Sequence, residues 1–346
     1  MSRAVRFSEF GPPEVLKTES VERPAVAPGA FLIRNESIGV NFIDIYFRTG
    51  LYPAELPNGL GVEGAGVIEE VGENTTHPQG LKPGDRVAYI SPGPRLPGSA
   101  SYAEYSSVPA ASVVRLPEGV SAQQGAAVLL QGLTAKSMIE VTTDVKKGAR
   151  GPRRGVALRG DWVLIHAAAG GTGQLLVQIA HQLGARVIAT VSTEEKAAIA
   201  RSLGAEEVIL YGRPGIDVAV EVQRITGGKG AYAAFDGVGQ TTFEASLASL
   251  GYLGWLVSFG NASGKVPPVD LLRLSDKGIR LLRPSLFSTL KSRDGLFLEL
   301  AEKLLADVAS GAVKQGVHKE YPLEEAGQAH IDLESRGTTG KLLLKP

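Results

Sequence analysis

The amino-acid sequence predicts an α/β protein with a β-rich domain and a second domain built on a doubly wound parallel sheet. Its 346 residues correspond to about two domains of about 150 residues each. Short strand-like runs between Gly and Pro turns fill roughly the first 125 residues, whereas strands and helices alternate from about residue 131 to about 286. Such alternation with continuously apolar strands is typical of a parallel sheet with helices on both faces.

Closely spaced short strands indicate the β-rich part. We expect them at residues 4–7, 31–35, 66–71, 86–89 and 106–109, with turns such as GPP at 11–13 and KPGD at 82–85 between them. This pattern favours a small barrel or sandwich. After about residue 286 we expect helices over 294–311 and 324–336 and a closing strand over 341–344. We assign this tail to the first domain.

The central part is expected to alternate strictly. Its predicted strands span 162–166, 186–190, 207–211, 232–236 and 255–259, and its predicted helices span 172–183, 194–203, 218–226 and 242–250. Right-handed crossovers between these strands would make the sheet doubly wound. Sheets of that kind bind ligands at the carboxyl ends of their strands.

Composition excludes several classes of function. The 36 Lys and Arg residues balance 36 Asp and Glu residues, so a chain-wide electrostatic attraction to nucleic acid or anionic lipid is not expected. The sequence has no cysteine, which excludes disulfides, thiolate nucleophiles, iron–sulfur clusters and zinc sites with Cys ligands. No apolar run reaches the about 18 residues of a membrane span, and the amino terminus shows no apolar signal core. We therefore expect a soluble cytoplasmic protein.

The most informative segment is a glycine-rich turn between a predicted strand and a predicted helix. It reads AAGGTG, and its candidate ligand-binding residues are Ala168, Gly170, Gly171, Thr172 and Gly173. Gly170 would let the backbone approach a pyrophosphate, and Gly173 would let helix and strand pack closely. The helix amino end would offer free N–H groups and a positive dipole to the phosphates. The pattern predicts dinucleotide binding; the alternative is a tight turn without a ligand.

Charge at the end of the second strand of this sheet predicts which dinucleotide binds. An NAD site usually has an Asp or Glu there, about 20 residues beyond the glycines. Residues 189–193 read ATVST, with no acid before Glu194. Such a pocket would not repel a 2′-phosphate, and Lys196 together with the hydroxyls of Ser192 and Tyr211 could bind one. We predict NADPH; the alternative is that Lys196 is an ordinary helix residue.

With these residues in view, the chain resembles the zinc-free quinone oxidoreductases of the medium-chain dehydrogenase/reductase superfamily, the group that includes zeta-crystallin. The resemblance rests on NFIDIYFRTGLY at 41–52, GLGVEGAG at 59–66, QGLT at 131–134, the glycine turn and SFGNASG at 258–264. It implies a GroES-like catalytic domain formed by residues 1–130 and 286–346, and a Rossmann NADPH-binding domain over 131–285. It also implies a homodimer.

The residues at the positions of the superfamily's zinc ligands argue against a metal. Zinc-dependent relatives use a Cys and a His where this chain has Asn41 and Val62, with Glu63 retained. An amide and an isopropyl group cannot replace a thiolate and an imidazole. Without a Lewis acid, the remaining reaction is reduction of acceptors that are already electrophilic, namely quinones or α,β-unsaturated carbonyls.

The resemblance also implies roles for individual residues. Asn41, Tyr46 and Tyr52 would line the catalytic slot, near Gln131 and Thr134. Asn41 would hydrogen-bond the nicotinamide-side ribose or the acceptor oxygen. The two tyrosines would stack on a flat ring or donate a proton, or else belong to the aromatic core.

Two further places are implied in the same way. Phe259, Gly260 and Asn261 follow a parallel strand and would lie against the nicotinamide end of the cofactor. Arg336 matches a position near the 2′-phosphate, although an Arg at that point could equally end a helix.

Two alternative functions remain open. The first is an alkenal or 2-enoyl reductase for which quinones are incidental substrates. The second is an NADPH-bound RNA-binding or structural protein of the zeta-crystallin type. The second depends on KKGARGPRRGVALRG at 146–160, which has six basic residues and no acidic one. This segment reads as an exposed loop, or as a local contact for an anion or a polynucleotide.

Overall fold

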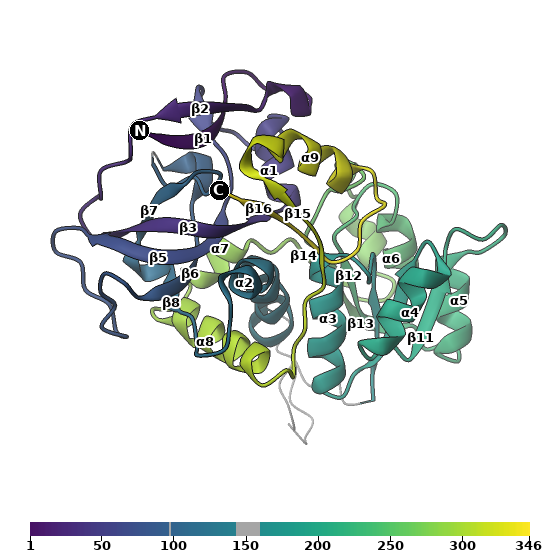
Figure 1. The fold of residues 1–346 in the computed structure, drawn as a ribbon. Coiled ribbons are helices and arrows are strands. Elements are labelled where there is room, and N and C mark those ends of the chain that lie inside the picture. Colours follow the sequence, from purple (N-terminus) through teal and green to yellow (C-terminus); the bar gives the residue numbers. More distant parts are fainter. Residues whose placement is uncertain (97, 143–159) are drawn as a thin grey trace. The chain divides into compact units, whose positions relative to one another are not determined.

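The computed structural model describes residues 1–96, 98–142 and 160–346 and separates the chain into two compact units (Figure 1). Unit 1 comprises Met1–Leu133 and Asp294–Pro346, and unit 2 comprises Thr134–Arg293. The predicted domain bounds lay at 130/131 and 285/286, so they differ from these divisions by several residues. The basic segment at 146–160 lies outside the described residues except for its last glycine, and so does the RNA contact proposed for it.

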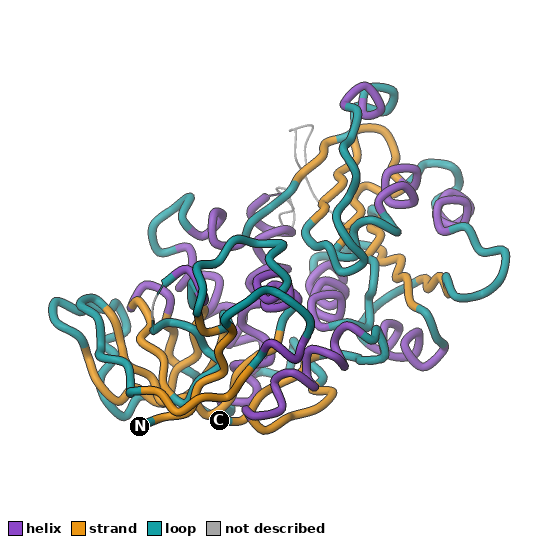
Figure 2. Tube along the Cα trace, turned by 90° about the horizontal axis from the view of Figure 1, so that it is seen from above, coloured by secondary structure: helices purple, strands orange, loops and turns teal. Residues whose placement is uncertain are grey.

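Unit 1 is built on two sheets. The larger one has the order β15 (Val317–Pro322), β16 (Lys341–Lys345), β3 (Ala30–Val40), β5 (Glu63–Val71), β6 (Arg86–Ile90), β8 (Val113–Arg115), and β7 (Tyr105–Pro109) pairs with β3. The smaller one has the order β2 (Lys17–Val21), β1 (Ser2–Phe7), β4 (Asn58–Gly59). The yellow strand β16 lies antiparallel to the purple β3, with Leu342 opposite Val40 (Figure 1). Both chain ends therefore lie at strands of this unit, as Figure 2 shows.

Helices cover the sheets of unit 1 through apolar faces. They are α1 (Phe42–Arg48), α2 (Ala122–Lys136), α8 (Leu296–Ala309) and α9 (Ala326–Glu334), with 3₁₀ turns at Pro13–Val15, Gly93–Arg95, Ala110–Ser112 and Leu323–Glu325. Along α8, Phe297, Leu300 and Leu304 are buried at helical spacing. A Cβ on Gly132 of α2 would stand 2.5 Å from Leu304 Cδ2, so glycine is what lets these two helices approach. Helix α2 crosses the division between the units at its last turn.

Unit 2 contains one six-stranded parallel sheet. Its order is β11 (Glu207–Leu210), β10 (Arg186–Val191), β9 (Trp162–Ile165), β12 (Ala231–Asp236), β13 (Leu250–Ser258), β14 (Arg280–Leu282). Its helices are α3 (Gly171–Gln182), α4 (Glu194–Ser202), α5 (Val218–Ile225), α6 (Phe243–Ser249) and α7 (Leu286–Leu290), with a π-helix at Ser137–Thr142 and a 3₁₀ turn at Leu271–Leu274. Counted along the chain the strand order is 3-2-1-4-5-6, which is the doubly wound arrangement. The predicted fold class is confirmed.

One strand of unit 2 differs from its prediction. β13 begins at Leu250 rather than at residue 255, directly after α6 ends. In the sequence, the segment GYLG at 251–254 resembles a turn because it carries two glycines. In the structure, Leu253 of this segment also has a positive φ of 58°. A Cβ on Gly251 would lie 2.3 Å from Lys229 O, so this glycine permits a close backbone approach.

Among the residues described, no helix combines the length and the apolar character that a bilayer crossing requires.

Candidate active site

The glycine-rich turn joins β9 to α3, and its glycines serve different purposes. A Cβ on Gly173 would lie 2.3 Å from Ala167 O, whereas a Cβ on Gly170 would meet nothing closer than that same oxygen at 3.2 Å. Gly173 is therefore required by packing, and Gly170 leaves space beside the helix end. Gln174 Nε2 donates to Ala169 O (2.9 Å) and holds the turn. The first N–H groups of α3 have no acceptor within the helix and can bind an anion.

Replacing Gly173 with alanine is expected to lower the free energy of unfolding by about 1–3 kcal/mol, because the added methyl group overlaps the turn backbone. Gly170→Ala is the matched control and is expected to cost less, since its methyl group has more room. Urea unfolding followed by circular dichroism measures both. A Gly173→Ala protein as stable as the Gly170→Ala protein would contradict this reading of the turn.

A buried hydrogen-bond network ties the strand ends together close to this turn, and sequence reasoning missed it. Asp236 Oδ2 accepts from Ser246 Oγ (2.8 Å), and Ser246 Oγ pairs with His166 Nε2 (2.9 Å). The other ring nitrogen of His166 pairs with Thr190 Oγ1 (3.0 Å). Burial lowers the pKa of His166 and so favours the neutral imidazole. Because the Ser246 hydroxyl donates to Asp236, Nε2 of His166 donates to Ser246 Oγ and Nδ1 is the acceptor. The network links the ends of β9, β10 and β12.

The predicted 2′-phosphate residues follow two neighbouring strands. Val191 of β10 is in register with Leu210 of β11, so Ser192 and Tyr211 stand at adjacent strand ends. Lys196 is half-buried in the first turn of α4, where its backbone N–H donates to the capping residue Thr193 (3.3 Å). The structure thus brings Ser192, Lys196 and Tyr211 to one region of unit 2. Their binding of a phosphate stays a prediction.

Sequence reasoning did not consider the cation nearest to Glu194, the first acid after β10. Glu194 Oε1 accepts from Arg213 Nη2 at 2.5 Å, and Arg201 approaches the same carboxylate to 3.8 Å. Two arginines therefore place positive charge beside this exposed carboxylate. A signal was present, because Arg213 follows the end of β11 by only three residues.

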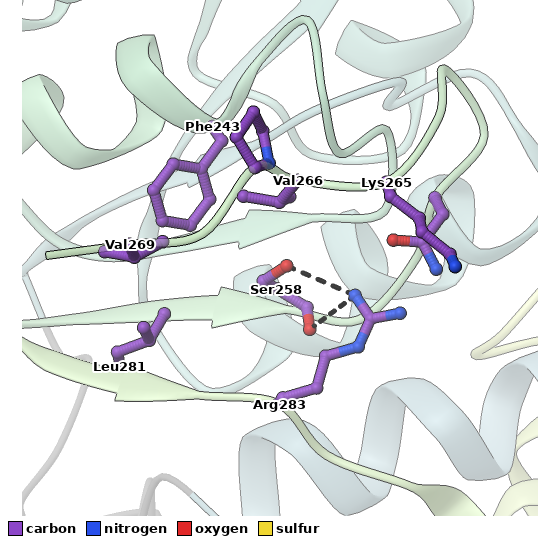
Figure 3. Close-up of a pocket in the computed structure, with 9 residues that line it drawn as sticks. Phe243, Ser258, Lys265, Val266, Val269, Leu281 and Arg283 are labelled. Carbon is purple, nitrogen blue, oxygen red and sulfur yellow. Dashed lines mark hydrogen bonds between the residues drawn. The ribbon is translucent and has the colours of Figure 1, made fainter.

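The loop after β13 borders a cavity of about 330 Å³ (Figure 3). Its lining is mostly apolar but includes two cations, and consists of Phe243, Ser258, Asn261, Lys265, Val266, Pro267, Val269, Leu281 and Arg283. Arg283 Nη1 donates to Ser258 O (3.1 Å) and Gly260 O (3.0 Å) and so fixes the loop. Of the three predicted residues, Asn261 lines the cavity, whereas the Phe259 ring packs over Gly237.

In unit 1, the carboxamide of Asn41 is saturated by the protein. Its Nδ2 donates to Glu63 Oε1 (2.7 Å) and Gly39 O (3.3 Å). Its Oδ1 accepts from Lys341 Nζ (2.7 Å) and Gln131 Nε2 (3.1 Å). A carboxamide offers two donors and two acceptor positions, so all four are used. The expected proximity of Asn41 and Gln131 is present, but a ligand would have to displace one of these partners to bond Asn41 directly.

The partner that sequence reasoning missed is Lys341. Its ammonium forms a close ion pair with Glu63 Oε1, and both side chains are fully buried. Pairing of β16 with β3 brings Lys341 to the residue that precedes α1. Glu63 Oε2 also accepts from the backbone N–H of Leu130 in α2 (2.8 Å). The carboxylate thus has a protein partner on each oxygen.

Tyr46 and Tyr52 form an edge-to-face pair. Their ring centroids lie 5.2 Å apart with an interplanar angle of 65°, and Tyr52 N donates to Tyr46 O (2.9 Å). Phe47 adds a second edge contact to Tyr52, with centroids 6.0 Å apart. Tyr46 is buried and Tyr52 is half-buried. The aromatic packing is present, and a role toward a flat ligand stays a prediction.

A second buried chain of polar groups starts at Asp44 in the first turn of α1. Its Oδ2 accepts from Asn41 N (2.8 Å) and from the hydroxyl of Tyr102 (3.0 Å). Tyr102 in turn pairs with His330 Nε2 (3.1 Å), and Arg48 Nη1 lies 3.1 Å from His330 Nδ1. Burial raises the pKa of Asp44 to about 7. Burial, reinforced by the Arg48 charge, lowers the pKa of His330 to about 3.

These shifts predict opposite effects of pH on stability. Asp44 titrates near 3.8 when unfolded and near 7 when folded, so its contribution to stability is full below about 3.8 and is lost as the pH rises to about 7. His330 acts in reverse, because its contribution is lost as the pH falls from about 6.5 to about 3. Asp44→Asn is therefore expected to gain stability over the wild type between pH 4 and pH 8, by about 1.4 kcal/mol for each pKa unit. The measurement is the difference in melting temperature between Asp44→Asn and the wild type at pH 4 and at pH 8. An equal difference at the two pH values would contradict the raised pKa of Asp44.

The two other predicted site residues, Thr134 and Arg336, are located by the helices α2 and α9. Thr134 lies one turn after Gln131 on α2, so the two share a helix face. Arg336 is exposed and adopts a φ of 61° directly after the residue that caps α9. That is the left-handed conformation that ends a helix, which supports the helix-end alternative for Arg336.

Comparisons with known proteins decide the family. Residues 27–118 match the model described as Alcohol dehydrogenase GroES-like domain, and residues 171–302 match the model described as Zinc-binding dehydrogenase. The chain is 39% identical to the quinone oxidoreductase of Pseudomonas aeruginosa, and the match covers 100% of both chains. The chain belongs to the quinone oxidoreductase family. The predicted resemblance is therefore confirmed, together with the GroES-like and Rossmann parts of the fold class.

Two further members show how widely this family matches the chain. The structure of Escherichia coli quinone oxidoreductase complexed with NADPH has a TM-score of 0.89 at 37% identity, and the match covers 99% of this chain and 100% of that one. A 2-haloacrylate reductase of Burkholderia sp. is 36% identical over 100% of this chain and 99% of its own length. Quinone oxidoreductases and a reductase of an unsaturated acid thus share this fold at similar identity.

The description of one matching family model mentions zinc, but this chain has other residues at two of the predicted ligand positions. Asn41 and Val62 stand at the predicted ligand positions, and Val62 is fully buried. Across residues 1–96, 98–142 and 160–346, no group of three or more His, Cys, Asp or Glu side chains could hold a metal ion. The retained Glu63 is engaged by Lys341. The Lys341 ammonium therefore places a positive charge beside both Glu63 and Asn41.

Proposed function

We propose that this protein reduces quinones with NADPH as the electron donor and without a catalytic metal. The observation that carries the proposal is the glycine turn before α3, together with a lysine in the first turn of α4, the helix that follows the next strand. Membership of the quinone oxidoreductase family supports the substrate class, and the Escherichia coli relative complexed with NADPH supports the cofactor.

The chain offers groups that fit this cofactor. The free N–H groups of residues 171–173 and the space beside Gly170 suit a pyrophosphate. Lys196 and Ser192 suit a 2′-phosphate. When bound, NADPH supplies the reducing electrons.

The substrate class follows from what the protein groups can supply. The superfamily's zinc enzymes use a Lewis acid to polarise the oxygen of an alcohol or a ketone, and in this chain the retained Glu63 is already committed to Lys341. A quinone needs no such help, because reduction makes its ring aromatic. The rings of Tyr46 and Tyr52 pack edge to face, and we propose that this aromatic pair packs against such a ring. The work of the protein is then to position the acceptor and exclude water.

An α,β-unsaturated carbonyl substrate is the second candidate, and the 2-haloacrylate reductase relative favours it. The two candidates are separated by comparing kcat/KM for an ortho-quinone and for a medium-chain 2-enal under the same conditions. We expect the higher value for the quinone. A far higher value for the enal would replace the first proposal with the second.

We also propose that the protein is a cytoplasmic homodimer joined through unit 2. The outer edge of β14 is the end of the six-stranded sheet, and Leu281 on it is 37% exposed. Leu271 and Leu272 in the same unit are 71% and 78% exposed, which is unusual for leucines on a free surface. The absence of cysteine suits a reducing compartment.

The dimer is tested by light scattering, which should give twice the mass of the chain. Leu272→Glu should shift the measured mass toward that of the monomer.

A further inference from the structure

We propose that His166, Thr190, Ser246 and Asp236, the strand-end network, are positioning residues for the glycine-rich turn. They hold the turn in the conformation that receives the pyrophosphate of NADPH, and they join it to the loop that follows β12. The inference rests on the proposed function, because it assigns a support for that same cofactor site. All four residues belong to unit 2.

The argument starts from Ala167, the residue directly before the glycine pattern. Its φ is 49°, in the left-handed region that residues with a side chain rarely adopt. Such a conformation persists only where the surrounding structure imposes it. Ala167 O accepts from Gly170 N (2.9 Å), so the conformation of Ala167 sets the path of the turn.

Hydrogen bonds on both sides of Ala167 impose this conformation. The N–H of His166 donates to Phe235 O on β12 (3.2 Å), and the N–H of Ala168 donates to Thr190 O on β10 (3.2 Å). The hydroxyl of Thr190 also lies 3.0 Å from Nδ1 of His166. Thr190 therefore binds the residues before and after Ala167, one through its side chain and the other through its backbone.

Helix α6 holds the imidazole of His166 at its other nitrogen. Nε2 donates to Ser246 Oγ (2.9 Å), and Ser246 donates to Asp236 Oδ2 (2.8 Å). The four residues of the strand-end network are at most 4% exposed, so water does not compete for these bonds. If His166 turned away from Thr190, it would leave a buried donor and a buried acceptor unpaired, which is costly.

Asp236 extends the strand-end network to the loop after β12. Its Oδ1 accepts from the backbone N–H groups of Val238 and Gly239, at 2.9 Å each. Its backbone oxygen accepts from Phe259 N (2.8 Å), where the loop after β13 begins. One buried carboxylate thus fixes the start of one loop, adjoins a second, and is connected to the glycine-rich turn.

The part of the ligand that depends on this support is the pyrophosphate. Residues 168–173 lead into the first turn of α3, whose backbone N–H groups can bind an anion. Such hydrogen bonds depend on angle as well as on distance, so the N–H groups must be held in fixed directions. A turn that samples other conformations binds more weakly, because ordering it opposes binding. Loss of the strand-end network should therefore weaken only ligands that carry a pyrophosphate.

The first test interrupts the network at one hydroxyl. Ser246→Ala leaves Asp236 and His166 in place and removes the group that joins them. Calorimetry of the whole protein measures the binding of NADPH and of adenosine 2′-phosphate, which has no pyrophosphate. We expect Ser246→Ala to weaken NADPH binding about 3- to 10-fold, the effect of one hydrogen bond, and to leave adenosine 2′-phosphate binding unchanged.

Ser249→Ala is the matched control for this variant. Ser249 is a fully buried serine on the same helix, and its hydroxyl donates to Ala245 O (2.7 Å) outside the strand-end network. Both variants lose one buried hydroxyl, so their melting curves should shift to a similar extent. Ser249→Ala should nevertheless bind both ligands as the wild type does. The comparison separates positioning of the turn from a general loss of stability.

The second test removes the bond on the other side of His166. Thr190→Val keeps the shape of the side chain but deletes its hydroxyl, and we expect it to weaken NADPH binding about 3- to 10-fold as well. The matched control is Thr226→Val, because the hydroxyl of Thr226 is also buried but lies before the amino end of β12 and donates to Val222 O (2.8 Å). In Ser246→Ala/Thr190→Val the loss of NADPH affinity should be smaller than the product of the single losses, since both act through His166.

The outcomes separate the two proposals. A wild-type protein that binds neither ligand overturns the proposed function and this inference with it. A wild-type protein that binds both, with unchanged NADPH affinity in Ser246→Ala and Thr190→Val, overturns the inference alone. So do equal losses for NADPH and adenosine 2′-phosphate, or losses of NADPH affinity in Ser249→Ala and Thr226→Val as large as those in the network variants.

Discussion

Replacing Lys341 with methionine is expected to lower the free energy of unfolding by about 3–5 kcal/mol. The ammonium is fully buried and is bonded to Glu63 and Asn41. Methionine removes the positive charge but fills similar space, so the Glu63 carboxylate stays buried without its counter-charge. Urea unfolding followed by circular dichroism measures the loss.

Two controls make this result specific. Glu63→Gln/Lys341→Met is expected to recover most of the loss, because no uncompensated charge remains. Lys345→Met changes an exposed lysine on the same strand and should stay within about 0.5 kcal/mol of the wild type. A single Lys341→Met protein as stable as Lys345→Met would show that the ion pair does not have the importance assigned to it.

Replacing Lys196 with alanine is expected to weaken NADPH binding about 10- to 150-fold, because one good lysine–phosphate contact contributes about 1.5–3 kcal/mol. NADH lacks the 2′-phosphate, so its use should change little. The measurement is the dissociation constant of both cofactors for wild type and variant, supported by their KM values.

The matched control for this experiment is Lys229→Ala. Lys229 is exposed and precedes the amino end of β12, whereas Lys196 follows the carboxyl end of β10. We expect the control to bind both cofactors as the wild type does. Equal losses of NADPH and NADH in Lys196→Ala would contradict the assignment of the 2′-phosphate.

Local pattern was sufficient to predict the fold class. The strands of unit 2 are continuously apolar and each is followed by a helix, which is a property of neighbouring residues alone. The requirement for glycine at 173 could also be inferred, since helix and strand must cross closely at that turn. Strand β13 was harder, because two glycines in a strand resemble a turn.

The polar networks could not be predicted, because they join residues that are distant along the chain. Lys341 reaches Asn41 across 300 positions, and only the pairing of β16 with β3 brings them together. A weak signal existed, since Lys341 adjoins three leucines and Glu63 lies in a run of small apolar residues. Opposite charges within two apolar strands are candidates for a buried pair.

The site residues were predicted only in part for a related reason. The expected proximity of Asn41 to Gln131 depends on matching motifs and is present in the structure. The saturation of Asn41 depends on Lys341 and Glu63 together, which no motif contains. The predicted role of Asn41 as a direct ligand contact stays a prediction, and a ligand would have to displace one of its four partners.

The central claim is metal-free reduction of quinones by NADPH. It is tested most directly by following NADPH oxidation with a quinone, using protein that has been dialysed against a chelator and assayed for residual zinc. The account predicts full turnover with substoichiometric metal and no increase when zinc is added. An absence of NADPH oxidation with every quinone tried, or activity only after zinc is restored, would contradict it.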